Sequence, residues 1–417
     1  MTNNPSMRLS DLCDFVASQV DPQSCPEAVY IGLEHVASRR FERIGEGRAA
    51  DVQSAKYAFQ PSDVLYGKLR PYLDKAVLAS DAGVCTTELL VLRPKDGIDP
   101  RFVVGVVHAP SFIEHAVAGS TGVQHPRTSW THIANFELPD FDRDEQTTIG
   151  NLLWQVHGAI TANEKAIEAG TELKRAAMRE LFTRGLRGEA QRETEIGSVP
   201  ESWDVVPLGS LGRVGNGSTP KKSIREYWEG GDFPWLTSAK VYDRDIVAAD
   251  QFVTATALRE CHLPQVEPGA IVIAITGQGK TLGHCAVLRM RATINQHIAY
   301  VTTDLDRADP SFVRGYVETK YDYLRQVGSG GGSTKGALTC AFLRELPIPL
   351  PPTLDEQREI VAILDAIDRK VDLHRKKRAV LDELFKALLH KLMTGKIRVA
   401  DLDLSALAPA PIAEAAQ

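Results

Sequence analysis

Several classes of protein are excluded by what this sequence lacks. The six cysteines, at positions 13, 25, 85, 261, 285 and 340, lie far apart and form no Cys-x-x-Cys pair, so neither a zinc ribbon nor a disulfide framework is expected. No run approaches the roughly 20 apolar residues that a membrane helix needs, and the opening MTNNPSMRLSDL lacks the order of a signal peptide. We therefore expect a cytoplasmic protein with no membrane partner.

A surplus of positive charge is also absent. The 417 residues include 48 Lys and Arg against 54 Asp and Glu, which gives a net charge of -6. A domain that holds DNA unaided usually carries a basic surplus against the phosphates. If DNA is a partner, the cations must therefore be local or come from other subunits. The hydrophobic share of 43% is ordinary for folded chains, and the length predicts two or three domains.

Signatures of catalysis are missing as well, among them the Asn/Asp-Pro-Pro-aromatic motif of amino-methyltransferases and the helicase motif set. The one enzyme-like segment is AITGQGKT, from Ala274 to Thr281, which fits a permissive phosphate-loop pattern if alanine replaces the first glycine. Such a loop works only when a helix N-terminus follows it, yet the next residues alternate like a strand. We favour a glycine-rich hairpin carrying Lys280, and a nucleotide-hydrolysing enzyme is the alternative.

The most informative feature that is present is an internal repeat with an offset of 211 residues. Segment 144–183 aligns without gaps with segment 355–394, and both open with Asp-Glu-Gln and end in Thr. Apolar residues recur at spacings of three and four without an internal proline, so each copy predicts one long helix of roughly 60 Å. The simplest way to bury two apolar seams is to pair them, and a pseudo-two-fold repeat makes the pair antiparallel.

Ahead of each predicted helix lies a region of short β-rich runs, such as VLYGKL and ELLVLRP in the first and AIVIAIT and HIAYVTT in the second. We therefore predict an α+β fold with two β-rich domains, separated by two long antiparallel helices that form a coiled coil. The predicted boundaries are a first domain at 1–143, a central helix at 144–187, a second domain at 188–352, a C-terminal helix at 353–395 and a disordered tail at 396–417.

Two glycine-rich stretches occupy corresponding places before the two helices. One is GSTGVQHPRTSW, from Gly119, and the other is GSGGGSTKGALT, from Gly328, which contains no acid. Such loops let backbone amides, hydroxyls and a cation approach phosphate oxygens closely. The alternative is a flexible surface linker, but the matching places in both halves favour a binding function.

Other side chains are suited to reading base edges, because amides and guanidinium groups form bidentate pairs with adenine and guanine in the major groove. Together with the glycine-rich stretches, they give candidate DNA-binding residues in both domains. In the first domain these are Lys68, Arg70, Ser120, Thr121, Gln124, His125 and Arg127. In the second they are Lys221, Lys222, Lys240, Thr276, Gln278, Lys280, Asn295, Gln296, His297, Ser333, Thr334 and Lys335. For any one of the base-reading candidates taken alone, a solvated surface role is favoured over a role in reading bases.

The whole arrangement resembles the specificity subunit of Type I restriction-modification enzymes. The resemblance rests on ELPDFDRDEQ and LPIPLPPTLDEQ at the helix starts, on FQPSDVLYGKLRPYLDK and CTTELLVLRP in the first domain, and on VPESWDVVPLGSL, GDFPWLTSAKV and NQHIAYV in the second. It covers nearly the whole chain. It implies that each β-rich domain is a target-recognition domain for one half of a bipartite, asymmetric DNA sequence, and that the paired helices set the distance between the halves. We find no good copy of LYGKLRPYLDK in the second domain, and so expect different half-sites.

The resemblance also implies partners. Besides double-stranded DNA, these are two methyltransferase subunits and two ATP-dependent restriction and translocase subunits, in a complex that defends the cell against phage. S-adenosylmethionine, ATP and magnesium would belong to those partners, so this chain is expected to bind no cofactor or metal and to be no enzyme. A purely structural coiled-coil adaptor that never meets DNA is a further alternative.

Overall fold

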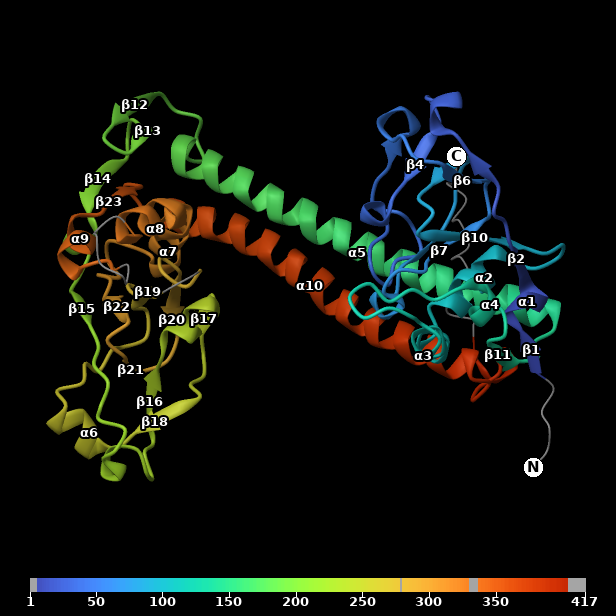
Figure 1. Ribbon diagram of the computed structural model, residues 1–417. Helices are drawn as coiled ribbons and strands as arrows, with labels where there is room; N and C mark the ends of the chain where they lie inside the picture. The colour runs from blue at the N-terminus through green and yellow to red at the C-terminus, as the bar shows by residue number, and fades with distance from the viewer. Residues whose placement is uncertain (1–5, 278–279, 330–336, 404–417) are drawn as a thin grey trace, which may run out of the picture. The chain divides into compact units, whose positions relative to one another are not determined.

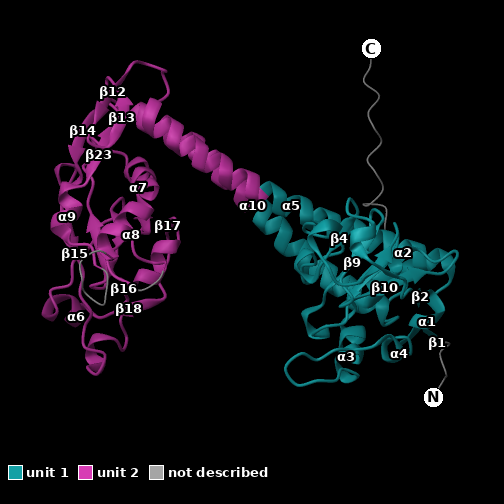
Figure 2. Ribbon diagram, turned by 45° about the horizontal axis from the view of Figure 1, so that its top comes forward, with its two compact units in different colours: residues 1–166, 374–417 teal, residues 167–373 magenta. Residues whose placement is uncertain are grey.

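The computed structural model describes residues 6–277, 280–329 and 337–403 (Figure 1). The chain splits into two compact units (Figure 2). Unit 1 holds residues 1–166 and 374–417, and unit 2 holds residues 167–373. Two long helices, α5 (Arg143–Arg184) and α10 (Leu354–Met393), contribute to both units. Within the described ranges, no helix has the length and apolar character needed to cross a membrane.

Unit 1 is built on two sheets. The first has the strand order β2-β10-β7-β8, with β2 at Cys13–Phe15, β10 at Leu89–Pro94, β7 at Val64–Gly67 and β8 at Ala76–Leu78. The second has the order β3-β6-β9-β4-β5, with bounds Gln19–Val20, Lys56–Phe59, Gly83–Cys85, Val29–Ile31 and Gly47–Arg48. Because side chains alternate along a strand, Tyr66 enters one apolar cluster and its neighbour Leu65 the other.

Helices cover the first sheet of unit 1 on the face that carries Tyr66. The same cluster takes in Phe102 of α2 (Pro100–Val107), Phe112 of α3 (Pro110–Ala118) and Ile133 of α4 (Trp130–Ile133). Two short strands, β1 (Ser6–Arg8) and β11 (Glu137–Pro139), pair just ahead of α5, and the short helix α1 (Leu9–Leu12) follows β1. The chain therefore leaves the β-rich part directly into the long helix.

Unit 2 repeats this plan. Its main sheet has the order β15-β22-β19-β20-β17, with bounds Val214–Asn216, Ile298–Val301, Ile271–Ala274, Cys285–Leu288 and Asp245–Ile246. A second sheet, β18-β16-β21, comprises Gln251–Val253, Phe233–Leu236 and Thr293–Ile294. The helices are α6 (Ala255–Glu260), α7 (Pro310–Thr319), α8 (Tyr321–Ser329) and α9 (Cys340–Glu345). The remaining strand pairs are β12 (Gln191–Thr194) with β13 (Gly197–Pro200) and β14 (Asp204–Pro207) with β23 (Pro347–Leu350).

The strand orders add a correspondence that the sequence does not show. The second half has no sequence copy of LYGKLRPYLDK, yet β19 occupies in its sheet the place that β7 occupies in the first. Both strands lie between an antiparallel partner that precedes the next helix and a short hairpin strand. The correspondence was hidden because a strand position needs only alternating apolar side chains, which many different residues supply.

The repeated Asp-Glu-Gln explains how each long helix is attached. Gln146 and Gln357 are both buried at equivalent positions, and their side-chain amides donate to the carbonyl oxygens of Phe141 and Pro351, at 2.8 and 3.4 Å. Each glutamine therefore fixes the first turn of its helix to the segment that leads into it. A buried amide N–H needs an acceptor, and at both junctions a backbone carbonyl supplies it, so the sequence repeats this residue where the structure repeats the junction.

The two long helices pair in antiparallel fashion, as predicted. In unit 1, a Cβ atom added to Gly105 would touch both Leu153 of α5 and Met393 of α10, while Asn163 of α5 is hydrogen-bonded to His374 of α10. Residue numbers thus rise along one helix as they fall along the other. In unit 2, Met178 and Phe182 of α5 share an apolar cluster with Ile360 and Leu364 of α10.

The segment after α10 differs in part from the expectation of a disordered tail. Ile397, Val399 and Leu402 pack against the apolar cluster of unit 1, and the Arg398 guanidinium pairs with the carboxylate of Glu145. This short apolar stretch therefore belongs to the folded unit. The rest of the tail, residues 404–417, lies outside the described residues.

Candidate nucleic-acid interface

In unit 1 the glycine-rich stretch that begins at Gly119 lies against the end of strand β7. The backbone N–H of Thr128 donates to the carbonyl of Lys68 at 3.1 Å, and that of Arg70 donates to the carbonyl of Pro126 at 2.7 Å. Leu69 and Arg127 form an isolated β-bridge between the same two segments. These contacts join the candidate residues 68, 70, 120, 121, 124, 125 and 127 in one cluster of two adjacent loops.

The loop itself is a small hairpin. Thr121 and Arg127 exchange backbone hydrogen bonds of 3.0 and 2.9 Å, and Gly122 adopts a φ of 99°, which favours glycine. At the tip, Gln124 and His125 are exposed, so their side chains are open to a ligand. The hairpin thus presents an amide, an imidazole and hydroxyls on a short backbone whose ends are fixed.

A constrained turn presents Arg70 beside this hairpin. Arg70 and Asp74 flank the turn Pro71–Leu73 and both adopt left-handed backbone conformations, with φ of 51° and 52°. Asp74 is buried and accepts a 2.6 Å hydrogen bond from Nδ1 of His108. Left-handed non-glycine residues cost roughly 1–3 kcal/mol each, so they persist only where the surroundings hold them. The Arg70 guanidinium donates to the carbonyl of Gln124, which ties the turn to the hairpin.

Arg127 is less available than the sequence suggested. Its Nε lies 2.9 Å from a carboxylate oxygen of Glu88, and this hydrogen bond raises the pKa of the guanidinium. The pair involves residues 39 positions apart, which sequence reasoning did not connect. The structure therefore gives Arg127 a bound partner inside unit 1, and any phosphate would have to compete with Glu88 for it.

In unit 2 the candidates Thr276, Gln296 and His297 are joined by hydrogen bonds. The Thr276 hydroxyl bonds to Nδ1 of His297, and the Gln296 amide lies 3.1 Å from Nε2 of the same ring. Asn295 is buried and its Oδ1 accepts from the backbone N–H of His297 at 3.0 Å, so its role is to shape the loop. Thr219, which the sequence analysis did not single out, donates to Oε1 of Gln296. In the sequence, the stretch GNGSTPKK places hydroxyls beside two lysines, and this pattern could have identified Thr219 as a candidate.

Lys221 and Lys222 follow Thr219 closely and are both exposed. The indole N–H of Trp228 donates to the carbonyl of Lys221 at 3.3 Å, which anchors the backbone at this point. Their ammonium groups therefore extend from the same loop whose threonine is bonded to Gln296. This loop joins two cations to the polar group of unit 2.

The remaining candidates of unit 2 are not part of this group. The Lys240 ammonium lies 2.8 Å from Asp243 and 3.7 Å from Asp250, and its hydrogen bond to Asp243 raises its pKa, so two carboxylates already neutralise it. Lys280 is exposed, and its carbonyl accepts a 2.6 Å hydrogen bond from the Tyr321 hydroxyl. Gln278, Ser333, Thr334 and Lys335 lie outside the described residues.

The two loop groups are built by matching backbone contacts. Thr128 N–H donates to the carbonyl of Lys68 at 3.1 Å in unit 1, as Leu338 N–H donates to that of Ile275 at 2.7 Å in unit 2. The bridge between Leu69 and Arg127 corresponds to that between Thr276 and Ala337. The glycine-rich stretches therefore enter and leave their loops at equivalent places in the two units.

Unit 2 also contains a cationic depression that sequence reasoning missed. Its volume is about 600 Å³, and its lining includes Arg213, His262 and Arg344 but no carboxylate. Gly212 and Gly215 lie in the wall, where an added Cβ would collide with Thr302 or Tyr300. Arg213 and Arg344 are 131 residues apart in the sequence, so only the fold brings them together.

The phosphate-loop alternative is not supported. The backbone N–H of Gly283 donates to the carbonyl of Ala274 at 3.0 Å, and strand β20 begins at Cys285. Within the described residues, AITGQGKT is thus followed by a turn and a strand, with no helix N-terminus to bind phosphate. In the same part of the chain, no group of three or more His, Cys, Asp or Glu residues is placed to hold a metal ion.

Comparison with known proteins adds independent findings. The family described as Type I restriction modification DNA specificity domain matches residues 200–383. From Methanocaldococcus jannaschii, the MjaIX specificity subunit is 30% identical over 215 residues, 49% of this chain and 48% of the relative, and the MjaVIII specificity subunit is 26% identical over 335 residues, 77% and 76%. The S subunit of a Type I system from M. genitalium shares the fold, with a TM-score of 0.64 at 16% identity, over 94% of this chain and 97% of that one.

Proposed function

We propose, from the premise that this chain belongs to the family of Type I restriction-modification specificity subunits, that it recognises the DNA target of such an enzyme. Each unit would read one half of a bipartite sequence. The non-identical loops, with Arg70, Gln124 and His125 in one unit and Thr276, Gln296 and His297 in the other, would make the two half-sites different. The paired helices α5 and α10 would set the length of the unread gap.

The observation that carries this proposal is the matching construction of the two loop groups. Equivalent backbone hydrogen bonds hold a glycine-rich loop against the end of β7 in unit 1 and of β19 in unit 2. One polar loop on a surface is common in any protein. Two such loops on repeated units with different side chains are what a reader of two different half-sites requires. A coiled-coil adaptor without DNA would leave this duplication unexplained.

Two of the six cysteines are poor candidates for a nucleophile. Burial raises the pKa of the Cys85 and Cys285 thiols to about 12, which keeps both protonated and unreactive near neutral pH. We place the chemistry on partner subunits, as membership of this family implies. Those partners would bind S-adenosylmethionine, ATP and magnesium, and this chain would bind none of them.

The partners would be two methyltransferase subunits and two restriction and translocase subunits, assembled in the cytoplasm around double-stranded DNA. This composition makes the acidic balance of the chain intelligible, because its net charge is -6 while the loops carry local cations such as Lys68, Lys221 and Lys222. Cations on the partners would supply the remaining contacts to phosphates, whose neutralisation supplies much of the affinity for DNA.

The test is long-read methylation mapping in cells that express this chain with a cognate methyltransferase subunit. We expect one methylated motif made of two short half-sites separated by an unread gap. Replacing Gln124 and His125 with alanine should relax the sequence at one half-site, and replacing Gln296 and His297 should relax the other. Methylation without sequence preference, or the same change in both half-sites from either variant, would contradict the proposal.

A further inference from the structure

The two long helices are repeats of each other, so two ways of pairing compete. Helix α5 can pair with α10 of its own chain, or two copies of the chain can pair α5 with α5 and α10 with α10. We propose that residues which differ between the repeats match α5 to α10, and so disfavour a dimer in which α5 pairs with α5 and α10 with α10. This inference concerns assembly and goes beyond the recognition of DNA.

The first matched contact is an aromatic stack in unit 1. The ring of Phe41 lies between the rings of His108 and His157, with centroid distances of 5.1 and 4.7 Å, and makes an edge contact of 5.5 Å with Phe385. His157 of α5 and Phe385 of α10 are themselves 6.0 Å apart. All of these residues are buried. The helix pair thus presents an uncharged surface, made by His157 and Phe385, to Phe41 of unit 1.

The second matched contact is ionic and lies in unit 2. The Lys174 ammonium of α5 is 3.0 Å from the carboxylate of Asp368 of α10. Arg244, from the β-rich part of unit 2, reaches the same Asp368 at 2.8 Å, and Glu318 of α7 lies 3.0 Å from Lys174. The side chains of Lys174 and Asp368 are both less than 20% exposed. The helix pair thus presents an ion pair, made by Lys174 and Asp368, to the remainder of unit 2.

The contact of His157 with Phe385 and the contact of Lys174 with Asp368 occupy the same two positions of the repeat. Asp368 is the repeat equivalent of His157, and Phe385 is the repeat equivalent of Lys174. Pairing α5 with α10 therefore puts aromatic beside imidazole and cation beside carboxylate. Pairing two copies of α5 would put Lys174 against His157, and pairing two copies of α10 would put Asp368 against Phe385. Either arrangement takes from a largely buried charge one of its two partners, Asp368 from Lys174 or Lys174 from Asp368, which is destabilising.

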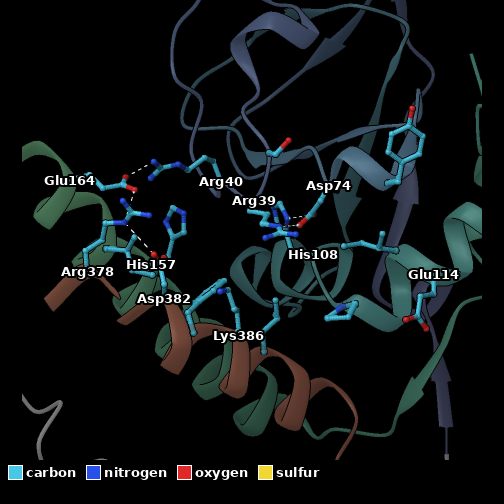
Figure 3. Close-up of a pocket in the computed structure, with 17 residues that line it drawn as sticks. Arg39, Arg40, Asp74, His108, Glu114, His157, Glu164, Arg378, Asp382 and Lys386 are labelled. Atoms are coloured by element: carbon cyan, nitrogen blue, oxygen red, sulfur yellow. Dashed lines mark hydrogen bonds and ion pairs between the residues drawn. The ribbon is translucent and has the colours of Figure 1, made fainter. Parts of the chain in front are cut away.

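A third matched contact lies near the middle of the pair and is drawn in Figure 3. Glu164 of α5 lies 3.5 Å from Arg378 of α10, and Arg40 pairs with the same carboxylate, at the edge of a cavity of about 750 Å³ in unit 1. The repeat equivalent of Glu164 is Arg375. Two copies of α10 would therefore bring Arg375 of one against Arg378 of the other, and like charges at facing positions repel.

Packing adds a steric reason. An added Cβ on Gly170 of α5 would lie 2.6 Å from Cγ2 of Val371 of α10, so the native pair has no room for a side chain there. The repeat equivalent of Gly170 is Leu381. Two copies of α10 would drive a leucine into that space. A few such polar and steric mismatches are how helix pairs reject wrong partners.

Two double variants with the same burden of charge separate this proposal from simple loss of stability. In His157→Asp with Phe385→Lys, the introduced acid faces Lys174 when two α5 helices pair, and the introduced base faces Asp368 when two α10 helices pair. Pairing of α5 with α5 and of α10 with α10 thereby gains complementary charges. In His157→Lys with Phe385→Asp, the native pair is still complementary, but both wrong pairs bring like charges together. Each variant places one acid and one base beside Phe41.

Two full-length copies of the chain that carry different tags are expressed together. The measurement is how much of one copy is recovered when the other copy is purified through its own tag. We expect the Asp/Lys variant to show at least tenfold more captured partner than the wild type, and the Lys/Asp variant to stay at the level of the wild type. Equal capture by the two variants, at either level, would overturn the proposal.

A surface variant covers the case in which both double variants fail to fold. Arg375 is exposed, and Arg375→Glu turns the repulsion between two copies of α10 into an attraction toward Arg378, whereas Arg375→Lys preserves the repulsion. We expect several-fold more capture with the glutamate variant than with the lysine variant. No difference between these two variants would overturn the proposal.

Discussion

The side chains of Asn163 and His374 are hydrogen-bonded to each other at 2.8 Å, and the two residues occupy the same position of the two repeats. One lies in α5 and the other in α10. A bond between equivalent residues is what an antiparallel pair of repeated helices produces at its crossing point. The polar pair lies among apolar and ionic contacts between the helices, and a buried polar pair of this kind fixes the register of two helices at some cost in stability.

This bond gives a first prediction. Exchanging the two residues, as Asn163→His with His374→Asn, keeps one amide and one imidazole in the same place, so we expect the free energy of unfolding to change by less than about 0.5 kcal/mol. Asn163→Ala leaves the imidazole without its partner and should cost about 1–2 kcal/mol. Urea unfolding of the three proteins measures both values. A swap as damaging as the alanine variant would show that the pair is not interchangeable.

Two glycines of α5 give a second prediction. A Cβ added to Gly150 would lie 2.8 Å from the backbone nitrogen of Phe102, which cannot move without moving α2, whereas a Cβ on Gly158 would meet nothing within 4 Å. Gly150→Ala should therefore destabilise unit 1 by roughly 1–3 kcal/mol. Gly158→Ala should stabilise the helix by up to about 1 kcal/mol, because alanine is the better helix former. Thermal unfolding that shifted both variants in the same direction would contradict the close packing of α5 on α2.

His157 gives a prediction about pH. Burial lowers its pKa from 6.5 to about 4, with Arg40 and His108 acting in the same direction and Asp382 opposing them, and its Nε2 accepts the backbone N–H of Phe41. As the pH falls, His157 of the unfolded chain therefore binds a proton near pH 6.5, whereas His157 of the folded unit binds it only near pH 4. The stability of unit 1 should fall as the pH drops from about 6.5 to about 4, by up to roughly 3 kcal/mol from this group.

The control for this pH effect is His157→Gln, which keeps an acceptor near Phe41 but does not titrate. We expect the loss of stability between pH 7 and pH 5 to be smaller in this variant than in the wild type. The difference between the two proteins isolates His157 from the carboxylates that titrate in the same range. Parallel pH profiles would mean that His157 is as easily protonated in the folded chain as in the unfolded one.

The cations of unit 1 give a prediction about salt. Replacing Lys68 and Arg70 with alanine should weaken DNA binding by the assembled complex and reduce the slope of log K against log salt by about 1 for each phosphate that these side chains neutralise. Replacing Arg48, an exposed arginine on β5 that pairs with Glu27, should leave the slope unchanged. Fluorescence anisotropy at several salt concentrations measures the slopes. Equal slopes for the loop variant and the wild type would remove these two residues from the interface.

The sequence predicted the long helices well because their signal is local and repeated. Spacings of three and four along 144–183 and 355–394 settle the helix, and α5 and α10 begin and end within a few residues of those segments. The α+β class and the antiparallel pairing followed from the same repeat. The matching places of the two glycine-rich loops were also visible in the sequence, because each precedes its helix by a similar distance.

The candidate sites were harder to predict because the availability of a side chain depends on its partners in the fold. Lys240 is neutralised by Asp243, three residues along the chain, and by Asp250, and this local pairing was visible in the sequence. Arg127 is bound by Glu88, 39 residues away, and Thr219 is bonded to Gln296, 77 residues away. These two distant pairs form when strands far apart in the sequence become neighbours, and periodicity along the chain carries no information about them.

The central proposal, that α5 and α10 set the length of the unread gap between two half-sites, is tested most directly by lengthening both helices. Four residues inserted into both helices, just after Asn163 and just before His374, add one turn of about 6 Å to each and keep the helices paired. Methylation mapping of this variant should return the same two half-sites with a gap longer by about two base pairs, at roughly 3.4 Å for each. An unchanged gap, or new half-site sequences, would contradict the claim.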